Sequence, residues 1–393
     1  MDIICPYDKC TGCQACKQIC PKEAISMVEN ERGFIYPIVD NDLCIDCGLC
    51  QKKCPSVTPV SKHTPIQVYA GWNKDADDRK TSNSGGISYL LSQYIVGSGG
   101  YFCGASWDID SKCTKHVVTN DVNKLSLYQG SRYSHSDTGD CFKEIRGLLN
   151  SGKSVLFTGT PCQVAALKNF LGKEYDKLMT VDLICHGVPS KLTLRDRINT
   201  IEKRYNRKIV DMKSREKTPD QLFTSTKYTF EDGSCYRISV FKDPFFRSFV
   251  ENYTLRPNCF GCEYAGKERV SDITIGDYWG YNPHSLRYRD YQKGNSVIII
   301  NTQKGRHILE AISNRLVLDE RTYEDAASCN QNLNSPQPCP NNRDEFWKEY
   351  ISGKTLDDLL DKYYPPIVMR RTFKDKVRIF LKMILPTSLY LKK

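Results

Sequence analysis

The order of hydrophobic and polar positions predicts a layered domain that begins near residue 67. Runs of consecutive apolar residues suit buried strands, and segments whose apolar residues recur every three to four positions suit helices. Strands are predicted at 68–72, 101–107, 154–157, 179–184, 273–275 and 296–300. Helices are predicted at 87–96, 141–149 and 162–171, and a further helical pattern begins after Pro189 and ends at residue 205. An Asp-Gly turn predicts a hairpin between residues 227 and 241. This alternation indicates α/β layers.

The last pattern in the chain predicts a basic amphipathic helix. Its apolar residues recur at helical spacing, with lysines and arginines between them, until Pro386 ends the pattern. The apolar positions are Phe373, Val377, Phe380, Leu381 and Ile384. Such a helix can lie on an anionic membrane face, or it can dock against the protein body or an acidic partner. We expect no nucleic-acid binding, because the tail has no groove-reading motif.

Length and charge refine this picture. The chain has 393 residues, enough for two or three domains. Its net charge of +10 lies mostly in the tail, since residues 367–393 hold eight basic residues and one acidic residue. The first residues do not resemble a signal peptide, and the longest aliphatic run, 297–300, is too short to span a bilayer. We therefore expect a cytoplasmic protein, with peripheral membrane contact through the tail as an alternative.

The 19 cysteines indicate metal ligation rather than disulfides, because many fall into short-spaced runs. The run Cys-x2-Cys-x2-Cys-x3-Cys-Pro occurs twice, 34 positions apart, within residues 1–58. This spacing is typical of two-cluster bacterial ferredoxins, in which the fourth cysteine of each run ligates the other cluster. One 4Fe-4S cluster is then assigned to Cys10, Cys13, Cys16 and Cys54, and the other to Cys44, Cys47, Cys50 and Cys20. Cys5 is surplus to this pattern, and we interpret it as a bystander.

Four further cysteines are candidates for a third site: Cys162, Cys185, Cys259 and Cys262. Cys162 falls on the opening turn of a predicted helix, and Cys185 follows the next predicted strand. If the two strands are parallel neighbours, both cysteines lie at the same edge of the sheet. The pair Cys259-x2-Cys262 needs two more ligands, which these two would supply. Spacing alone leaves three alternatives open: a third cluster, a zinc site, or ordinary buried thiols.

Three motifs between residues 159 and 280 resemble the coenzyme F420 hydrogenase/dehydrogenase beta-subunit family. They are Gly-Thr-Pro-Cys-Gln-Val-Ala at 159–165, Cys-His-Gly-Val-Pro-Ser at 185–190, and Glu-Arg-Val-Ser-Asp-Ile-Thr-Ile-Gly-Asp-Tyr-Trp-Gly at 268–280. The resemblance spans roughly residues 65 to 340. It implies FAD, and a 4Fe-4S cluster on the four internal cysteines, hence three clusters in all. It also implies electron transfer between a two-electron carrier and iron-sulfur clusters, often with a ferredoxin module in front.

The sequence itself points to a flavin only weakly. Residues 82–86 precede a predicted helix, so their amides could cradle a phosphate, or they could form an ordinary N-cap and turn. A second candidate segment, 130–136, carries the family's basic-Tyr-x-x-Ser pattern. By resemblance, the FAD contacts are Ser84, Gly85, Gly86, Arg132, Tyr133 and Ser136. No catalytic side chain is assigned, because Asp277 and Tyr278 at a strand end also suit turn and packing roles.

The predicted organisation is a two-cluster ferredoxin-like module at 1–58, a linker at 59–66, a mixed α/β flavin- and cluster-binding domain at 67–340, and a helical segment at 341–393. The expected function is that of an FAD- and iron-sulfur-dependent oxidoreductase. Its redox carrier would be ferredoxin or coenzyme F420, and its substrate or partner subunit is unidentified. Surface-polysaccharide metabolism is one setting for such a reductase. The alternatives are an F420-reducing or F420-oxidising beta subunit, and a non-catalytic electron-transfer subunit of a larger complex.

Overall fold

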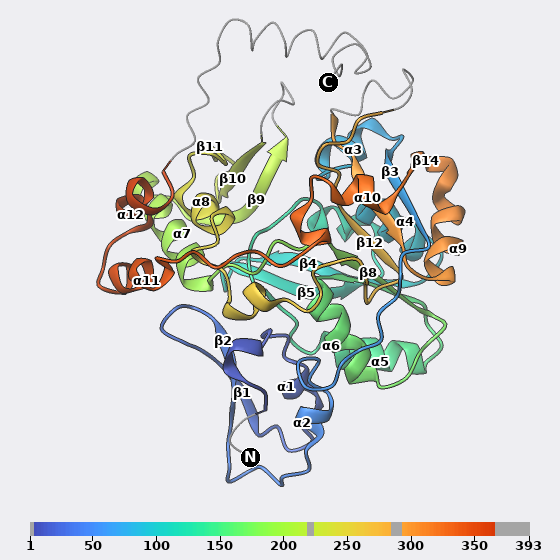
Figure 1. Cartoon of the computed structure of the whole chain (residues 1–393), viewed down its shortest axis with the longest axis horizontal. Coiled ribbons are helices and arrows are strands. Elements are labelled where there is room, and N and C mark those ends of the chain that lie inside the picture. Colours follow the sequence, from blue (N-terminus) through green and yellow to red (C-terminus); the bar gives the residue numbers. More distant parts are fainter. Residues whose placement is uncertain (1–3, 218–223, 284–292, 366–393) are drawn as a thin grey trace, which may run out of the picture.

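The computed structural model of the chain describes residues 4–217, 224–283 and 293–365. An N-terminal module lies at one end of the molecule, a large sheet domain lies above it, and a smaller sheet with its helices lies beside the large sheet (Figure 1). The predicted amphipathic helix at 373–385 lies outside the described residues. None of the helices within the described ranges combines the length and hydropathy of a membrane-spanning segment.

A mixed nine-stranded sheet forms the centre of the molecule. Its order is β14 (Leu316–Arg321), β3 (Gln67–Asn73), β13 (Ser296–Ile300), β12 (Ile273–Asp277), β8 (Leu178–Leu183), β7 (Val155–Gly159), β4 (Tyr101–Asp108), β5 (Cys113–Thr119) and β6 (Ser136–Asp137). Strands β12, β8, β7 and β4 are parallel. Strand β13 is antiparallel to both β12 and β3, so β3 also runs in the direction of β12. The carboxyl ends of all five strands therefore share one edge, where α/β sheets usually bind ligands.

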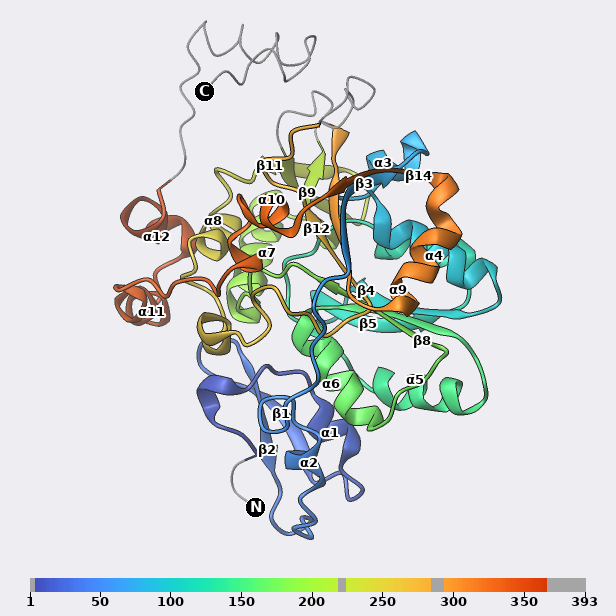
Figure 2. The same ribbon diagram turned by 45° about the vertical axis from the view of Figure 1, so that its right-hand side comes forward.

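Helices cover both faces of this sheet (Figure 2). They are α3 (Ala76–Thr81), α4 (Ile87–Gly97), α5 (Cys141–Asn150), α6 (Pro161–Leu171), α9 (Gln303–Ile312) and α10 (Tyr323–Ala327). Alternate residues of β7 show the two layers: Leu156 packs with α4 and α9, whereas Val155 and Phe157 pack with α5 and α6. The strands and helices predicted for this domain lie close to their predicted positions, and the fold is mixed α/β as expected. Strands β5, β6 and β14 of this sheet and helices α3, α9 and α10 were not predicted.

The smaller sheet contains three antiparallel strands and an aromatic core. Its strands are β9 (Ile209–Lys217), β10 (Thr224–Phe230) and β11 (Cys235–Ser239), and the helices around it are α7 (Lys191–Tyr205), α8 (Pro244–Val250), α11 (Arg343–Ile351) and α12 (Leu356–Tyr363). The predicted Asp-Gly hairpin is the connection between β10 and β11. Phe346, Trp347 and Tyr253 pack in its core together with Phe34 of the N-terminal module. The module and the small sheet therefore share buried apolar surface.

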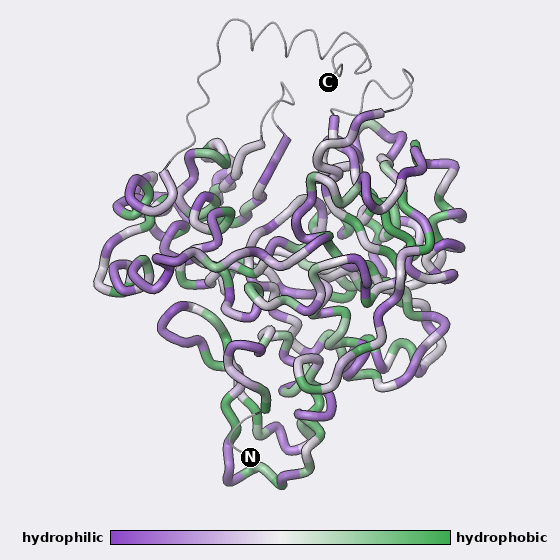
Figure 3. Tube along the Cα trace, viewed as in Figure 1, coloured by the Kyte–Doolittle hydropathy of each residue, from purple (hydrophilic) through white to green (hydrophobic). Residues whose placement is uncertain are grey.

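The N-terminal module is a hairpin with two short helices. Its elements are α1 (Ala15–Ile19), β1 (Ile25–Glu29), β2 (Ile35–Val39) and α2 (Leu49–Lys52). Ala15 is fully buried in the core that α5 and α6 form on the large sheet. Figure 3 shows hydrophobic stretches in the strands of the large sheet and also in this module. In the module several of them are exposed, namely Val28, Ile38, Leu43 and Ile45.

The segment between the module and the sheet domain, 59–66, is hydrogen-bonded to that domain. The backbone N–H of His63 donates to the carbonyl of Arg269 (2.7 Å), and Ile66 donates to Ile300 (2.7 Å). Arg269 itself is buried and forms an ion pair with Asp182 of β8 (2.9 Å). Its guanidinium also donates to the carbonyls of Leu183 and Tyr264. This one side chain therefore joins the linker, the end of β8 and the segment before β12.

We expect Arg269→Met to lower the free energy of unfolding by about 3–5 kcal/mol, because the buried Asp182 carboxylate loses its partner. The double variant Arg269→Met/Asp182→Leu should be less destabilised, since it leaves no unpaired buried charge. Urea denaturation followed by circular dichroism measures both effects. Arg207→Met is the control, because Arg207 is half exposed and pairs with an exposed Asp232; its effect should stay within about 0.5 kcal/mol. Equal losses in Arg269→Met and the control would contradict the expectation.

Candidate metal and cofactor sites

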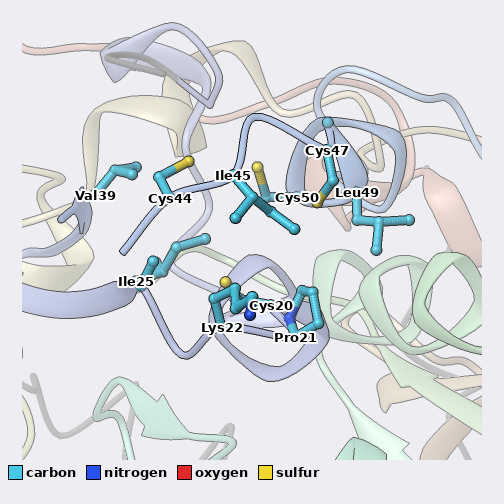
Figure 4. Close-up of a pocket in the computed structure, with 12 residues that line it drawn as sticks. Cys20, Pro21, Lys22, Ile25, Val39, Cys44, Ile45, Cys47, Leu49 and Cys50 are labelled. Atoms are coloured by element: carbon cyan, nitrogen blue, oxygen red, sulfur yellow. The ribbon is translucent and has the colours of Figure 1, made fainter. Parts of the chain in front are cut away.

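The N-terminal module contains two cavities that are lined by cysteines. The first cysteine cavity, of about 310 Å³, is bordered by Cys5, Cys10, Cys13, Cys16 and Cys54. The second, of about 380 Å³, is bordered by Cys20, Cys44, Cys47 and Cys50 (Figure 4). Each cavity thus brings together three cysteines of one run and the fourth cysteine of the other run. These are the two ligand groups expected from the spacing, with Cys5 added to the first.

The two loops that carry these cysteines have the same backbone geometry. In the first run, Gly12 and Gln14 have φ values of 68° and 65°. In the second run, the equivalent Asp46 and Gly48 have φ values of 49° and 67°. Left-handed residues at these two places curl the loop around its cavity, a backbone shape in which successive N–H groups favour negative charge. The sequence repeat is therefore also a repeat of local conformation.

The internal cysteine group, Cys162, Cys185, Cys259 and Cys262, comes from three separate segments. Cys162 is the second residue of α6, and its sulfur lies 3.1 Å from the Thr160 hydroxyl. The backbone N–H of Val188, just after Cys185, donates to the Cys259 sulfur (3.4 Å). The Cys185 thiol is close enough to interact electrostatically with the other three thiols. Since β7 and β8 are parallel neighbours, the predicted meeting of Cys162 and Cys185 at one sheet edge occurs.

Burial sets the protonation of the internal group. It raises the pKa of the Cys162 and Cys185 thiols, and it raises the pKa of Cys259 to about 11. These sulfurs would be neutral thiols until a cationic centre binds and displaces their protons. Among the described residues, no three His, Cys, Asp or Glu side chains converge as a single metal ion would require. The ligands of a four-iron cubane lie farther apart than the ligands of a single ion.

The first cysteine cavity and the internal cysteine group are adjacent. The thiol of Cys13 is close enough to Cys162 to affect its ionisation, and the Tyr264 hydroxyl is close to both. Cys13, Tyr264, Cys162 and Cys262 pack in one apolar core with α5 and α6. Two groups of thiols from distant parts of the sequence therefore meet where the module joins the sheet domain.

Arg256 holds this junction together. It is fully buried, and its guanidinium donates to the carbonyls of Cys10 (2.6 Å) and Ile35 (2.8 Å) in the module. It also lies 4.3 Å from the ring centroid of Tyr36. Three residues later the chain reaches Cys259. Arg256 thus couples the first cysteine cavity to the internal cysteine group, and its positive charge lies beside both.

A cationic pocket of about 640 Å³ lies at the carboxyl ends of β3 and β12. Its lining comprises Asn83, Ser84, Arg215, Lys217, Thr224, Asp277, Tyr278, Trp279, Lys293, Gly294 and Asn295. Arg215 has a φ of 59° within a β-bulge of β9, a feature often found beside functional sites. Its guanidinium pairs with Asp277 and lies 5.0 Å from the ring centroid of Trp279. The bulge thus aims a cation into the pocket.

Of the six predicted FAD contacts, Ser84 lines the cationic pocket, and its hydroxyl hydrogen-bonds to Asp277. Gly85 is packed against the backbone of β3 and donates its N–H to Ser296 (2.9 Å), so lack of space explains its identity. Gly86 is the N-cap of α4 with a φ of 78°. Segment 82–86 is therefore a turn and N-cap in which one of the predicted contacts faces the pocket.

The predicted contacts in the second segment do not line the cationic pocket. Arg132 pairs with Asp211 of β9 (3.2 Å), and the Ser136 hydroxyl bonds to Nδ1 of His116 (2.7 Å). The Tyr133 hydroxyl lies 3.4 Å from Arg215, which connects this segment to the cationic pocket. The two predicted segments thus approach one another through Arg215, which sequence reasoning did not single out. The alternation of cations at 213, 215 and 217 was the available signal.

Several buried polar atoms around residues 130–136 have no hydrogen-bond partner among the described residues. They are Thr114 Oγ1, Arg132 Nε, His135 Nε2, Thr158 Oγ1 and Ser214 Oγ. Backbone contacts join this segment to Ser214, and His116 joins it to Thr158. Unpaired buried polar groups are costly unless a ligand or water satisfies them. A polar ligand beside segment 130–136 would fit these atoms.

Two regions of the chain match known protein families. Residues 152–326 match the family described as the C terminus of the beta subunit of coenzyme F420 hydrogenase/dehydrogenase, and residues 9–57 match the 4Fe-4S dicluster domain. The chain is 21% identical over 280 residues to the F subunit of the F(420)H(2) dehydrogenase of Methanosarcina mazei, covering 69% of this chain and 75% of that protein.

Two further matches are a ferredoxin and a solved structure. An uncharacterized ferredoxin of Methanocaldococcus jannaschii is 34% identical over 56 residues, 14% of this chain and 71% of that protein. The structure of the F420-reducing NiFe hydrogenase complex from Methanosarcina barkeri superposes with a TM-score of 0.45 at 18% identity, covering 76% of this chain and 92% of that one. The chain therefore contains a 4Fe-4S dicluster domain, followed by a region that matches the C terminus of the coenzyme F420 hydrogenase/dehydrogenase beta-subunit family.

Proposed function

We propose that the chain is an iron-sulfur flavoprotein oxidoreductase that passes electrons between a two-electron carrier and 4Fe-4S clusters. The observation that carries this proposal is the adjacency of the internal cysteine group to the first cysteine cavity, through Cys13 and Cys162. A function of this kind requires closely spaced one-electron carriers, and three groups of four cysteines supply ligands for three clusters.

The proposed ligands of the first cluster are Cys10, Cys13, Cys16 and Cys54, and those of the second are Cys20, Cys44, Cys47 and Cys50. The internal cluster would be held by Cys162, Cys185, Cys259 and Cys262. The cysteine-lined cavities and the mutual approach of the four internal thiols support these assignments. Cluster ligation would also compensate the burial of the internal thiolates.

FAD is proposed beside the cationic pocket. Bound flavin can accept a hydride and release electrons singly, which suits a junction with clusters. Arg215 and Lys217 supply positive charge for its pyrophosphate, and Ser84 supplies a hydroxyl. The unpaired polar atoms around Arg132 offer partners for a polar ring system. Four other predicted contacts would shape this site, although not all of them would touch the flavin: Gly85, Gly86, Tyr133 and Ser136.

The electron carrier is proposed to be coenzyme F420 or ferredoxin, with a partner subunit or an unidentified substrate on the other side. The name of the Methanosarcina mazei relative favours F420. The competing function is a non-catalytic electron-transfer subunit of a larger complex. The same relative favours it, because its name makes it one subunit of a dehydrogenase.

Anaerobic addition of reduced F420 distinguishes the enzyme from the electron-transfer subunit. Flavin bleaching with turnover of an acceptor supports an enzyme, and bleaching without turnover supports an electron-transfer subunit. A cytoplasmic location, with membrane contact through the basic tail, is also a proposal.

Iron content tests the internal cluster. Anaerobically purified protein should contain about twelve iron atoms per chain, and Cys162→Ala should lower this to about eight. The electron paramagnetic resonance signal of the two N-terminal clusters should persist in the variant. Cys329→Ala is the matched control, because Cys329 is exposed and lies outside the three cysteine groups. Unchanged iron in Cys162→Ala would refute the internal ligand set.

Arg215→Met tests the flavin site. Loss of a charge-assisted hydrogen bond of about 1.5–3 kcal/mol should weaken FAD binding roughly 10- to 100-fold. Fluorescence titration of the flavin-stripped protein measures this affinity. Arg237→Met, at an exposed position of the same small sheet, should bind FAD like the parent protein. Equal affinities for all three proteins would remove Arg215 from the site.

The pH dependence of FAD binding should depend on Lys217. Burial, together with the nearby Arg79 cation, lowers the pKa of Lys217 to about 8. The ammonium is therefore present at pH 7 and lost as the pH rises through about 8, so affinity for the anionic cofactor should fall between about pH 7 and pH 9. Lys217→Met should bind more weakly at neutral pH and lose most of this dependence. A slope that persists unchanged in Lys217→Met would assign the effect to another group.

A further inference from the structure

Cys5 lies at the first cysteine cavity although the repeat does not require it. The first cavity has five cysteines along its wall, whereas the second has four. The residue 34 positions after Cys5 is Val39, and Val39 lines the second cavity. At equivalent places of the repeat, one cavity thus has a thiol and the other an isopropyl group. An apolar side chain is therefore sufficient for packing, and the thiol of Cys5 needs another explanation.

The contacts of Cys5 single out two of the proposed ligands. Its side chain lines the same cavity as Cys10 and Cys54, and its thiol is close enough to interact with both of their sulfurs. Cys5 is partly buried. It packs against two clusters of buried apolar residues beside the cavity. One cluster contains Cys10, and the other contains Cys16 and Cys54. Cys5 is therefore a thiol held in place beside two sulfurs that would be bound to iron.

We propose that Cys5 is a reserve ligand of the first cluster that can replace Cys54. This inference rests on the proposed cluster at Cys10, Cys13, Cys16 and Cys54. In the exchange, the bond between iron and the Cys54 sulfur breaks and a bond between the same iron and the Cys5 sulfur forms. The proton of the Cys5 thiol would pass to the Cys54 thiolate, which lies on the wall of the same cavity. Iron, sulfur and electron counts are unchanged.

Chain connectivity favours Cys54 over Cys10 as the ligand that is replaced. Cys54 joins the cluster from a segment 38 positions after Cys16, whereas Cys5 lies five positions before Cys10. With Cys5 bound, all four ligands of the cluster would lie within residues 5–16. The cluster would then close a much shorter loop of the chain than it closes when Cys54 is bound. Cys10, in contrast, is fixed through its carbonyl by Arg256 (2.6 Å). The exchange would keep the first cluster in place when the second half of the module opens.

The test compares Cys54 with Cys20, because each is the fourth cysteine of its run and would ligate the cluster of the other run. Only Cys54 has a reserve thiol beside it. Cys54→Ala, Cys20→Ala, Cys5→Ala and the double variant Cys5→Ala/Cys54→Ala are purified anaerobically as full-length protein. Iron and acid-labile sulfide per chain are measured, and the reduced proteins are examined by electron paramagnetic resonance. Alanine is used because a serine oxygen could itself bind iron.

We expect Cys54→Ala and Cys5→Ala to keep the iron content of the parent protein, with a changed first-cluster signal in Cys54→Ala. Cys20→Ala should lose about four iron atoms, because Val39 offers no thiol. The double variant should lose about four as well, while retaining the second-cluster signal as evidence that it has folded. An equal loss of iron in Cys54→Ala and Cys20→Ala would overturn the proposal. Parent protein with clearly fewer than about eight iron atoms would instead refute the cluster assignment on which the proposal rests.

Discussion

The arrangement of the redox groups depends on one buried cation, Arg256. A guanidinium without exposure to water is costly unless its donors are satisfied and its charge is compensated. Here it donates to two carbonyls of the N-terminal module, at Cys10 and Ile35, and stacks against Tyr36. One of its nitrogens, Nη1, has no hydrogen-bond partner among the described residues. The negative charge of cluster thiolates nearby would compensate the remaining charge of this side chain.

This interaction joins the ferredoxin module to the sheet domain. Two small domains joined by a linker usually move independently unless their interface is large and apolar. In this protein the module shares buried surface with α5 and α6 on one side and with the small sheet on the other. The linker itself pairs with Arg269, which the ion pair to Asp182 anchors. The cysteine groups are thus held at fixed separations, as the proposed electron transfer between them would require.

The cationic pocket shows how local and distant residues combine in one site. Ser84 comes from the turn between α3 and α4, Asp277 from the end of β12, and Arg215 from a bulge in the small sheet. The sequence makes the turn at 82–86 a candidate phosphate site, but packing against β3 explains Gly85, and the Ser84 hydroxyl reaches the pocket. Alternating cations in a polar strand also suit a solvated face, so the sequence alone could not assign Arg215. Its left-handed backbone and its pairing with Asp277 exist only in the folded chain.

The sequence by itself determined which residues could ligate clusters, because the chemistry of Cys-x2-Cys-x2-Cys-x3-Cys lies within one short loop. It also predicted strands β3, β4, β7, β8, β12 and β13 and helices α4, α5, α6 and α7, since periodicity is local. It missed strands β5, β6, β9 and β14 and helices α3, α8, α9 and α10. Only the tertiary structure decided that Cys162, Cys185 and the pair at 259–262 meet, that Cys13 lies beside them, and that Cys5 faces the first cavity. Those relations join residues far apart in the chain. They arise from the packing of α6, the parallel pairing of β7 with β8, and the placement of the module by Arg256.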